Sequence, residues 1–463
     1  MKVKEVLETM DYGKAPEDSK PALEWIEKKG AKFGLFINGE SKLPEGREFF
    51  ESLNPATGEV LATICQAKQE DVDRAMNSAA QAQADWEGMG GPRRAKYLYA
   101  IARLVQKHSR LFAVIETLDN GKPIRESRDI DIPLVVRHFY FHAGAAQLME
   151  KEMPEHRAYG VAAQVVPWNF PLLMLAWKIA PALAMGNTVV IKPAEYTSLS
   201  AMLFAEICLE AGLPQGVVNI ITGDGKVGEM LVAHRLANKV AFTGSTDVGR
   251  KIREATAGQE KALTLELGGK SPYIVFDDAD LDSAVEGLVD AIWFNQGQVC
   301  CAGSRLFVHE GVAEVFHQKL KSRMDKLRVG NPMDKSVDLG AIIDPKQLES
   351  ISHKVEQGLK EGGKKYVGKS ELPDNGCFYP PTLITEVDPA CQLMQEEIFG
   401  PVLVGTTFRT PAEAVALANN TRYGLAASIW TENINLALDI APKIVCGVAW
   451  INSTNQFDAS AGF

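Results

Sequence analysis

Short runs of β-branched residues alternate with helical segments through the middle of the chain, and this order restricts the fold more than any other feature. Five such runs begin at Val161, Thr188, Val217, Lys239 and Leu263. Most of them are separated by helical stretches such as residues 198–211. Strands joined in this way lie parallel in one sheet with helices on its faces. The sequence therefore predicts a mostly parallel α/β sheet over this region.

A second series of strands and helices follows Lys270. Its strands are predicted to begin at Tyr273, Leu306, Pro401 and Ala427. We place the boundary between the two series at Gly268 and Gly269, because glycines at a strand end suit both a hinge and the close approach of a ligand. Before the first sheet, apolar residues at helical spacing predict helices over residues 70–86, 93–108 and 111–120, the last ending at Gly121.

Length and charge limit the possible functions. A chain of 463 residues exceeds what one hydrophobic core serves, so two or three domains are expected. The formal net charge is -10 without a basic block, which argues against nucleic acid or an anionic membrane as the main partner and favours a small molecule. No stretch approaches the roughly 18 uninterrupted apolar residues of a membrane span. The odd cysteine count without a CxxC pair, together with the absence of a secretory h-region, indicates a reducing compartment, most simply the cytosol.

Two short segments carry the residues that suggest chemistry. Leu-Glu-Leu-Gly-Gly-Lys at 265–270 contains Glu266, a carboxylate framed by leucines, which is typical of a general base with a raised pKa. The segment 295–305 contains Cys300 in a polar, glycine-rich context, which is typical of an exposed nucleophile. Most of the chain's seven cysteines (65, 208, 300, 301, 377, 391 and 446) must instead be small buried residues. Alone, Glu266 could equally be a solvated carboxylate at a strand end.

The order and wording of both segments resemble the aldehyde dehydrogenase superfamily, whose active sites use a Cys and a Glu in these contexts. The resemblance covers nearly the whole chain. It implies an α/β fold with a Rossmann-type NAD-binding domain (residues 1–145 and 161–267) and an α/β catalytic domain (268–442). It also implies a small bridging and oligomerisation element (146–160 and 443–463).

The resemblance implies a mechanism for NAD-dependent oxidation of an aldehyde to a carboxylic acid. The Cys300 thiolate would attack the carbonyl, and Asn169 in Pro-Trp-Asn-Phe-Pro would stabilise the oxyanion together with the Cys300 amide. After hydride transfer, Glu266 would deprotonate the water that cleaves the thioester. We choose Cys300 over Cys301 because the family nucleophile stands second after the Gly-Gln pair, and Val299 is the residue between them here.

Two glycine-bearing loops are candidates for binding the cofactor's phosphates. Gly223-Asp-Gly225-Lys-Val-Gly228 matches G-x-G-x-x-G, but the acidic residue expected about 20 positions later is absent. Residues 242–249 run from a strand end into a helix start, where backbone N–H groups can hold a pyrophosphate. Taken singly, either loop could be a tight turn. The resemblance favours the second, with Gly244 and Ser245 at the pyrophosphate, and Gly225 remains a further candidate.

The remaining cofactor residues are implied by the resemblance. Lys192 and Glu195 match the pair that holds the adenosine ribose, and Glu397 matches the residue on the nicotinamide ribose. Phe399 lies beside the nicotinamide in the family, and Trp168 is a further cofactor candidate. The carboxylate of Glu195 would accept hydrogen bonds from a 2'-hydroxyl but repel a 2'-phosphate, so NAD is expected over NADP.

Aromatic residues suggest the substrate, and histidines raise the question of a metal. Four aromatic side chains match the family's substrate tunnel and imply apolar or modest aldehydes, although such residues are more often core: Phe170, Trp177, Phe294 and Phe457. His138 and His142 have a metal-like spacing on one helix face. No carboxylate ligand pattern accompanies them, so we expect no metal.

The N-terminal wording at residues 11–17 and 22–26 is similar to the family-16 branch, whose chains carry a second aldehyde-dehydrogenase-like domain afterward. Some members of that branch lack the nucleophile, but Cys300 and Glu266 are both present here. Family chains continue past the position of Phe463 with a strand that joins the oligomerisation sheet. A hairpin predicted around 149–157 would pair with that strand. The resemblance also implies a homodimer or higher homo-oligomer.

Two rival functions stay open from the sequence. One is a CoA-acylating semialdehyde dehydrogenase, a class that usually lacks the residue matching Glu266. The other is a catalytically silent scaffold in a larger assembly.

Overall fold

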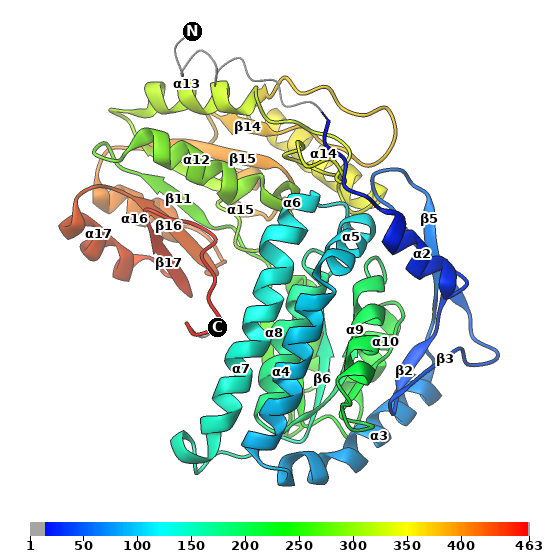
Figure 1. Ribbon diagram of the computed structural model, residues 1–463. Coiled ribbons are helices and arrows are strands. Elements are labelled where there is room, and N and C mark those ends of the chain that lie inside the picture. Colours follow the sequence, from blue (N-terminus) through cyan, green and yellow to red (C-terminus); the bar gives the residue numbers. More distant parts are fainter. Residues whose placement is uncertain (1–13, 462–463) are drawn as a thin grey trace.

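The computed structural model describes residues 14–461, which form two seven-stranded sheets and one three-stranded sheet. The two large sheets lie one above the other, each with its own helices (Figure 1). Helices α4, α5, α7 and α8 run roughly side by side along the lower sheet. No helix of the described residues combines the length and the apolar character needed to cross a membrane.

The first sheet has the strand order β10-β9-β6-β7-β8-β2-β3. Its strands are β2 (Leu35–Ile37), β3 (Glu40–Lys42), β6 (Val161–Val165), β7 (Thr188–Lys192), β8 (Val218–Ile220), β9 (Lys239–Thr243) and β10 (Ala262–Glu266). The strands from β6 to β10 pair in parallel, whereas β2 pairs antiparallel with both β3 and β8. Every run predicted between residues 161 and 267 is therefore a strand, and the predicted α/β fold is confirmed.

Side-chain alternation explains why both faces of this sheet are covered. In β6, Val161 and Ala163 join a core cluster with α3 and α10, while Ala162 joins the cluster on the opposite face. In β7, Val190 faces the first cluster, and Val189 faces the second. Buried apolar side chains on both faces are what a parallel sheet between two helical layers requires.

The helices of this first half include the three that were predicted before the first sheet, α3, α4 and α5. They are α2 (Lys20–Lys28), α3 (Gln69–Gly88), α4 (Gly91–Lys107), α5 (Ser109–Asn120), α6 (Ile124–Glu126), the π-turn Ser127–Asp131, α7 (Ile132–Glu152), α8 (Pro171–Ala184), α9 (Leu199–Glu210), α10 (Gly225–Ala233) and α11 (Thr246–Ala255). Helix α5 ends at Gly121 in the left-handed conformation (φ 89°), as predicted.

The second sheet has the order β13-β14-β15-β12-β11-β16-β17. Its elements are β11 (Pro272–Val275), α12 (Leu281–Ile292), the 3-10 turn Phe294–Gly297, β12 (Arg305–His309), α13 (Ala313–Met324), α14 (Pro345–Lys360), β13 (Lys364–Val367), β14 (Thr382–Thr385), α15 (Gln392–Gln395), β15 (Val402–Phe408), α16 (Pro411–Asn419), β16 (Ala426–Trp430), α17 (Ile434–Ile440), the 3-10 turn Ala441–Lys443 and β17 (Val448–Ile451). Strand β13 was not predicted, because it is a short, polar and largely exposed edge strand that pairs antiparallel with β14.

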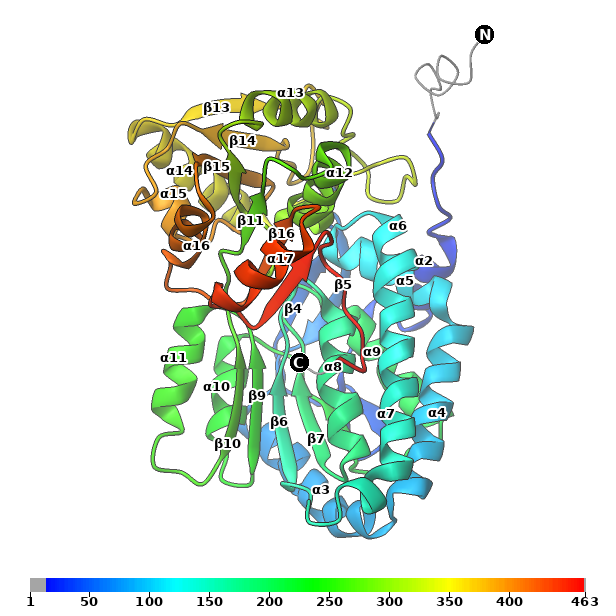
Figure 2. The same cartoon turned by 90° about the vertical axis from the view of Figure 1, so that its left-hand side faces the viewer.

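One expectation for the bridging element differs from the structure. The predicted hairpin around 149–157 is not formed: α7 continues through Glu152, and no strand occurs between α7 and β6. Helical hydrogen bonding therefore extends through the first part of the segment, to Glu152. At the other end, β17 pairs in parallel with β16 and so extends the second sheet. After β17 the chain runs down between the two halves (Figure 2).

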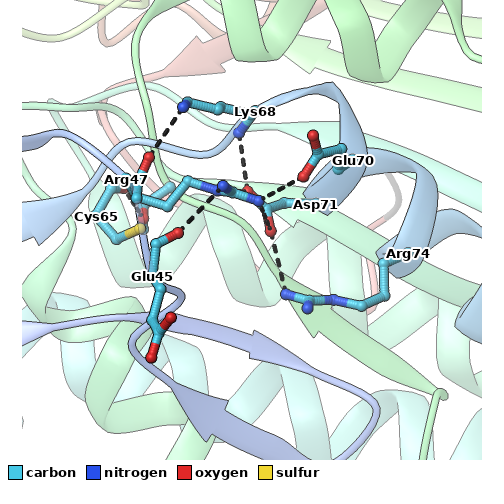
Figure 3. A network of polar contacts seen from close by, with 9 residues as sticks. Glu45, Arg47, Cys65, Lys68, Glu70, Asp71 and Arg74 are labelled. Carbon is cyan, nitrogen blue, oxygen red and sulfur yellow. Dashed lines mark hydrogen bonds and ion pairs between the residues drawn. The ribbon is translucent and has the colours of Figure 1, made fainter.

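A third, small sheet joins β1 (Lys32–Phe33), β5 (Val60–Cys65) and β4 (Phe49–Leu53). Its connection to α3 carries a network of ion pairs (Figure 3). Asp71 Oδ2 accepts hydrogen bonds from Arg47 Nε at 2.7 Å and from the Lys68 backbone at 3.0 Å. Gln66 exchanges two hydrogen bonds with Asp224, at 3.0 and 3.1 Å. The start of α3 is thereby tied to the loop that precedes α10.

Candidate active site

Cys300 lies half-buried in the loop between the 3-10 turn Phe294–Gly297 and β12. This nucleophile loop (residues 294–304) has an unusual backbone, because Asn295 (φ 47°) and Gln296 (φ 55°) are both left-handed. At Gly297 (φ 70°) an added Cβ would lie 2.1 Å from the Gly400 oxygen, so no side chain fits there. Such a conformation persists only where the surroundings impose it.

Two glutamines of the loop supply part of that support. Gln296 donates to the Ala341 carbonyl at 2.9 Å and accepts the Gly340 N–H at 3.2 Å. Gln298 Oε1 accepts the Ile343 N–H at 3.1 Å. Both side chains are buried. The polar residues Gln296 and Gln298 near Cys300 therefore hold the loop in its conformation.

Asn169 is brought to the nucleophile loop. Its side-chain Nδ2 donates to the Gln298 carbonyl at 2.8 Å, two residues before Cys300. In return, Asn295 Nδ2 donates to the Asn169 carbonyl at 2.8 Å. Asn169 is 4% exposed, so its orientation is set by these bonds. The amide is thus held beside the thiol-bearing segment.

Glu266 is the last residue of β10 and lies opposite Thr243 of β9. Burial raises its pKa, and the positive charge of Lys178 acts in the opposite direction. Lys178 Nζ donates to Thr243 Oγ1 at 2.6 Å. Burial lowers the pKa of Lys178 to about 8, while the negative charges of Glu266 and Cys300 both raise it. Through Thr243, Lys178 is held beside the strand end that carries Glu266.

Sequence reasoning missed Lys178. The available signal was its position as the only charged residue in α8, whose sequence is Pro-Leu-Leu-Met-Leu-Ala-Trp-Lys-Ile-Ala-Pro-Ala-Leu-Ala. Lys178 is half-buried, and a lysine withdrawn from solvent on an apolar helix suggests a function, because desolvation disfavours the charged form.

Gly268 and Gly269 form the contact between three segments. An added Cβ at Gly269 would lie 2.0 Å from the Cys300 carbonyl oxygen. One at Gly268 would lie 2.3 Å from Glu397 Oε2. The Gly269 N–H donates to Glu397 Oε1 at 2.9 Å. The segment after Glu266 thus packs directly between the nucleophile loop and Glu397.

Glu397 and Phe399 approach the same place from the second sheet. Burial raises the pKa of the Glu397 carboxyl, against the Gly269 N–H and the charges of Lys270 and Lys354. Phe399 has a positive φ of 57°, and its ring packs edge to face on Trp168 with centroids 5.3 Å apart. Because Trp168 precedes Asn169, these two predicted cofactor residues lie near the predicted oxyanion donor.

The Lys192 and Glu195 pair lies at the other predicted cofactor region. Lys192 Nζ donates to the Gly223 carbonyl at 2.6 Å and lies 3.5 Å from Glu195 Oε2. Burial lowers the pKa of Lys192, and Glu195 opposes this shift. An added Cβ at Gly228 would lie 3.5 Å from Lys192 Cε. The structure thereby brings the G-x-G-x-x-G loop next to Lys192.

Both candidate phosphate loops end at a capped helix N-terminus. Gly225 opens α10, where Asp224 accepts the Lys226 N–H at 3.0 Å. Ser245 caps α11, where its Oγ accepts the Val248 N–H at 3.3 Å. At Gly244 an added Cβ would lie 2.5 Å from the Phe242 ring. Each loop can present backbone N–H groups and a helix dipole to an anion.

The four predicted substrate residues form two aromatic pairs. Phe170 stacks on Phe294 with centroids 5.9 Å apart, and Trp177 meets Phe457 edge to face at 5.5 Å. Phe170 follows Asn169, and Phe294 begins the nucleophile loop. The first pair therefore lies beside the predicted catalytic residues.

The rings of His138 and His142 are stacked, with centroids 6.1 Å apart. Burial lowers the pKa of each to about 4. Across residues 14–461 no group of three or more His, Cys, Asp or Glu side chains is arranged to hold a metal ion.

Comparison with known proteins identifies the family to which this chain belongs. Residues 43–463 match the sequence profile described as the aldehyde dehydrogenase family. The chain belongs to the aldehyde dehydrogenase family. This membership confirms both the resemblance read from the two segments and the predicted class of enzyme.

Curated relatives agree over nearly the whole length. The chain is 41% identical over 442 residues to the putative aldehyde dehydrogenase DhaS of Bacillus subtilis, covering 93% of this chain and 89% of the relative. It is 42% identical over 443 residues to the mitochondrial aldehyde dehydrogenase family 2 member B4 of Arabidopsis thaliana, covering 93% of this chain and 82% of the relative.

Solved structures of the family share the fold. The NAD+ complex of the aldehyde dehydrogenase from Bacillus cereus superposes with a TM-score of 0.92 at 39% identity, covering 96% of this chain and 93% of that chain. An indole-3-acetaldehyde dehydrogenase of P. syringae, in complex with NAD+ and IAA, superposes with a TM-score of 0.89 at 35% identity. The latter match covers 94% of this chain and 92% of that chain.

Proposed function

We propose that this aldehyde dehydrogenase oxidises its substrate to a free carboxylic acid with NAD as hydride acceptor, using Cys300, Asn169 and Glu266. One observation carries the proposal: the Asn169 amide donates to the Gln298 carbonyl of the Cys300 loop, and Gly269, three residues after Glu266, packs against the Cys300 carbonyl. These three side chains come from segments far apart in the sequence. A nucleophile, an oxyanion donor and a base in one place fit acyl chemistry.

The roles follow from the atoms available. Cys300 Sγ attacks the aldehyde carbon, and the oxyanion accepts hydrogen bonds from the Cys300 backbone N–H and from the second N–H of the Asn169 amide. Bound NAD supplies the acceptor for the hydride that leaves this carbon. The thioester left on Cys300 is then cleaved by water. Glu266 accepts the water proton, and its raised pKa makes it a stronger base than an ordinary carboxylate.

The residues present fit NAD. Two helix N-termini, at Gly225 and Ser245, offer N–H groups for a pyrophosphate, and the side chain of Glu195 is 38% exposed. A carboxylate there favours a ribose hydroxyl over a phosphate, so we propose NAD over NADP. Glu397, Phe399 and Trp168 would meet the nicotinamide end. The NAD+ complex of the Bacillus cereus relative supports this choice.

We also propose the division of the chain into two domains and a bridging element. Residues 1–145 and 161–267 would form the NAD-binding domain and residues 268–442 the catalytic domain, because each large sheet draws nearly all its strands from one of these parts. Residues 1–13 and 462–463 lie outside the described part. The segments 146–160 and 443–463 would contribute to a homo-oligomer. Exposed apolar side chains accompany the second segment: Val445 is 73% exposed, and Ile434 (63%) and Leu438 (61%) lie in the preceding α17.

The finer assignments rest on sequence features. We propose that the chain falls in the family-16 branch and is followed by a second domain, on the wording of residues 11–17 and 22–26. Residues 11–13 lie outside the described structure. We propose a cytosolic location because all seven cysteines are free, as a reducing compartment keeps them. The substrate would be an apolar or modest aldehyde that fits beside the Phe170 and Phe294 pair.

Two variants test the proposed chemistry. Cys300→Ser should abolish NADH formation with every aldehyde, because a hydroxyl is a far weaker nucleophile than a thiolate. Glu266→Gln should give one burst of NADH and then stop, because the thioester forms but is not hydrolysed. Stopped-flow absorbance and mass spectrometry of the quenched protein measure both results. Cys301→Ser is the matched control and should keep turning over.

The same assay separates the rival functions. A silent scaffold would give no burst in the wild-type protein. A CoA-acylating enzyme would turn over only when CoA is added, and Glu266→Gln would then leave its rate unchanged. Full turnover in Cys300→Ser would contradict the assignment of the nucleophile.

A further inference from the structure

Glu126 lies behind the nucleophile loop and has no part in the chemistry above. It ends α6, and its side chain is buried at 4% exposure. Its Oε2 accepts the backbone N–H of Asn295 at 2.9 Å, a contact across 169 positions of sequence. A buried carboxyl aimed at one backbone group of the nucleophile loop needs an explanation.

The backbone that Glu126 holds is the strained part of the loop. Asn295 and Gln296 both have positive φ, which residues other than glycine rarely adopt. Two consecutive left-handed residues turn the chain sharply, and the turn aims the following segment toward Cys300. The hydrogen bond from the Asn295 N–H to Glu126 holds the first residue of this turn.

Asn295 passes this constraint to the catalytic groups. Its side-chain Nδ2 donates to the Asn169 carbonyl at 2.8 Å and lies 3.4 Å from the Gln298 carbonyl. Asn169 Nδ2 donates to that same Gln298 carbonyl at 2.8 Å. A shift of the Asn295 backbone would therefore move both proposed oxyanion donors, the Asn169 amide and the Cys300 N–H.

A purely structural role for Glu126, as the partner of the buried lysine nearby, is not what the contacts indicate. Lys122 Nζ donates to Asp131 Oδ2 at 2.5 Å, so it already has a carboxylate partner. Burial raises the pKa of Glu126 to about 8, against Lys122, the Asn295 N–H and Arg125, and Asp131 raises it further. A neutral carboxyl still accepts a hydrogen bond through its carbonyl oxygen.

We propose that Glu126 is a positioning residue for the dehydrogenase reaction, which holds the Asn295 backbone so that the Asn169 amide and the Cys300 N–H face the same oxyanion. This inference rests on the proposed function. It adds a residue of α6 to a site otherwise built from the loop before α8, the end of β10 and the nucleophile loop.

The test compares Glu126→Leu with Glu126→Gln. Leucine fills the buried space without an acceptor, whereas glutamine keeps one and resembles the neutral acid. In single-turnover stopped flow, Glu126→Leu should slow the NADH burst by about tenfold or more, because small misplacements of catalytic groups cost this much in rate. Glu126→Gln should restore most of the rate. The dissociation constant for NAD, measured by titration, should stay unchanged in both variants.

Asp119 offers a matched control. It is a buried carboxyl of α5 with a pKa raised by burial to about 7, and it accepts the backbone N–H of Leu199 at 2.9 Å, in α9. Asp119→Leu should lower the melting temperature as Glu126→Leu does. Its burst rate should stay within about twofold of wild type, because the Asp119 side chain bonds to Ser52 and to the Leu199 N–H, both outside the nucleophile loop.

The outcomes separate the two proposals. A wild-type protein without any burst contradicts the proposed function. A wild-type burst with an equal burst in Glu126→Leu overturns the role of Glu126, and so does an equal loss in Asp119→Leu. If Glu126→Leu does not fold, Glu126→Asp decides, because its shorter side chain withdraws the acceptor from Asn295. A wild-type rate in Glu126→Asp then overturns the inference.

Discussion

Single residues in this site act through their neighbours. Glu266 has the chemistry of a base, but its pKa is set by burial and by the charge of Lys178. Lys178 is itself held by Thr243, the residue beside Glu266 across β9 and β10. The sequence indicates Glu266 as a candidate base because leucines flank it and two glycines follow. Only the packing of α8 against this strand end shows what tunes it.

Replacing Lys178 by Met should move the pH dependence of thioester hydrolysis upward. The Lys178 charge lowers the pKa of Glu266, so its removal raises that pKa and the base becomes deprotonated at higher pH. The rising limb of kcat against pH, followed as steady-state NADH formation, should shift to higher pH. Lys261→Met is the control, since Lys261 bonds to the Val232 carbonyl and should leave the limb in place. A downward shift would contradict this account.

At the scale of elements, helix starts and strand ends place the functional groups. Glu266 ends β10, Ser245 caps α11 after β9, and Gly225 begins α10 after β8. All three therefore lie at the carboxyl ends of parallel strands of the first sheet. The helix α3 belongs to this arrangement because its start is tied through Gln66 to Asp224, the cap of α10. Asp71 at the start of α3 is buried and receives Arg47, Arg74 and the Lys68 backbone (Figure 3).

Replacing Asp71 by Ala should destabilise the protein strongly. The change leaves the guanidinium of Arg47, whose side chain is 12% exposed, without its closest partner and removes an acceptor at the helix start. We expect the free energy of unfolding to fall by about 3 kcal/mol, measured by urea denaturation. Glu70→Ala removes a neighbouring ion pair whose carboxylate is 80% exposed, and this control should cost less than about 1 kcal/mol. Equal losses would mean that burial does not decide the contribution.

At the scale of the whole molecule, the site exists where the two large sheets meet. The first sheet supplies Glu266 at the carboxyl end of β10, and the second sheet supplies Glu397 from the loop before β15. Gly269 lies between them, with its backbone against the Cys300 carbonyl. The glycine pair that the sequence suggested as a hinge or ligand passage is, in the structure, a close contact between the two halves.

Replacing Gly269 by Ala should disrupt the contact between the Gly269 backbone and the Cys300 carbonyl, and so lower activity. The new methyl group would lie 2.0 Å from the Cys300 oxygen, so one of the two backbones must move. We expect kcat to fall by about a hundredfold, since shifts near 1 Å cost that much, with a lower melting temperature. Gly88→Ala, where no atom lies within 4 Å of the added Cβ, should keep wild-type activity. Normal kcat in Gly269→Ala would show that the contact is not required.

The sequence by itself determined the parallel sheets and the chemical candidates. Runs such as 161–165 and 188–192 are apolar on both faces, which only a strand between helical layers satisfies. The motifs around Glu266 and Cys300 likewise indicated an aldehyde dehydrogenase, because the residues next to a catalytic side chain are restricted by the chemistry of that segment.

Tertiary structure alone decided which groups share an environment. The edge strand β13, the continuation of α7 in place of a hairpin, and the contacts of Lys178 and Glu126 depend on partners far away in the chain. Even where the sequence marks such a residue, as the lone charge of α8 marks Lys178, its protonation is set by burial and by charges brought close through folding. Local pattern therefore predicted the elements and the candidates, and packing between distant segments determined how they are positioned and tuned.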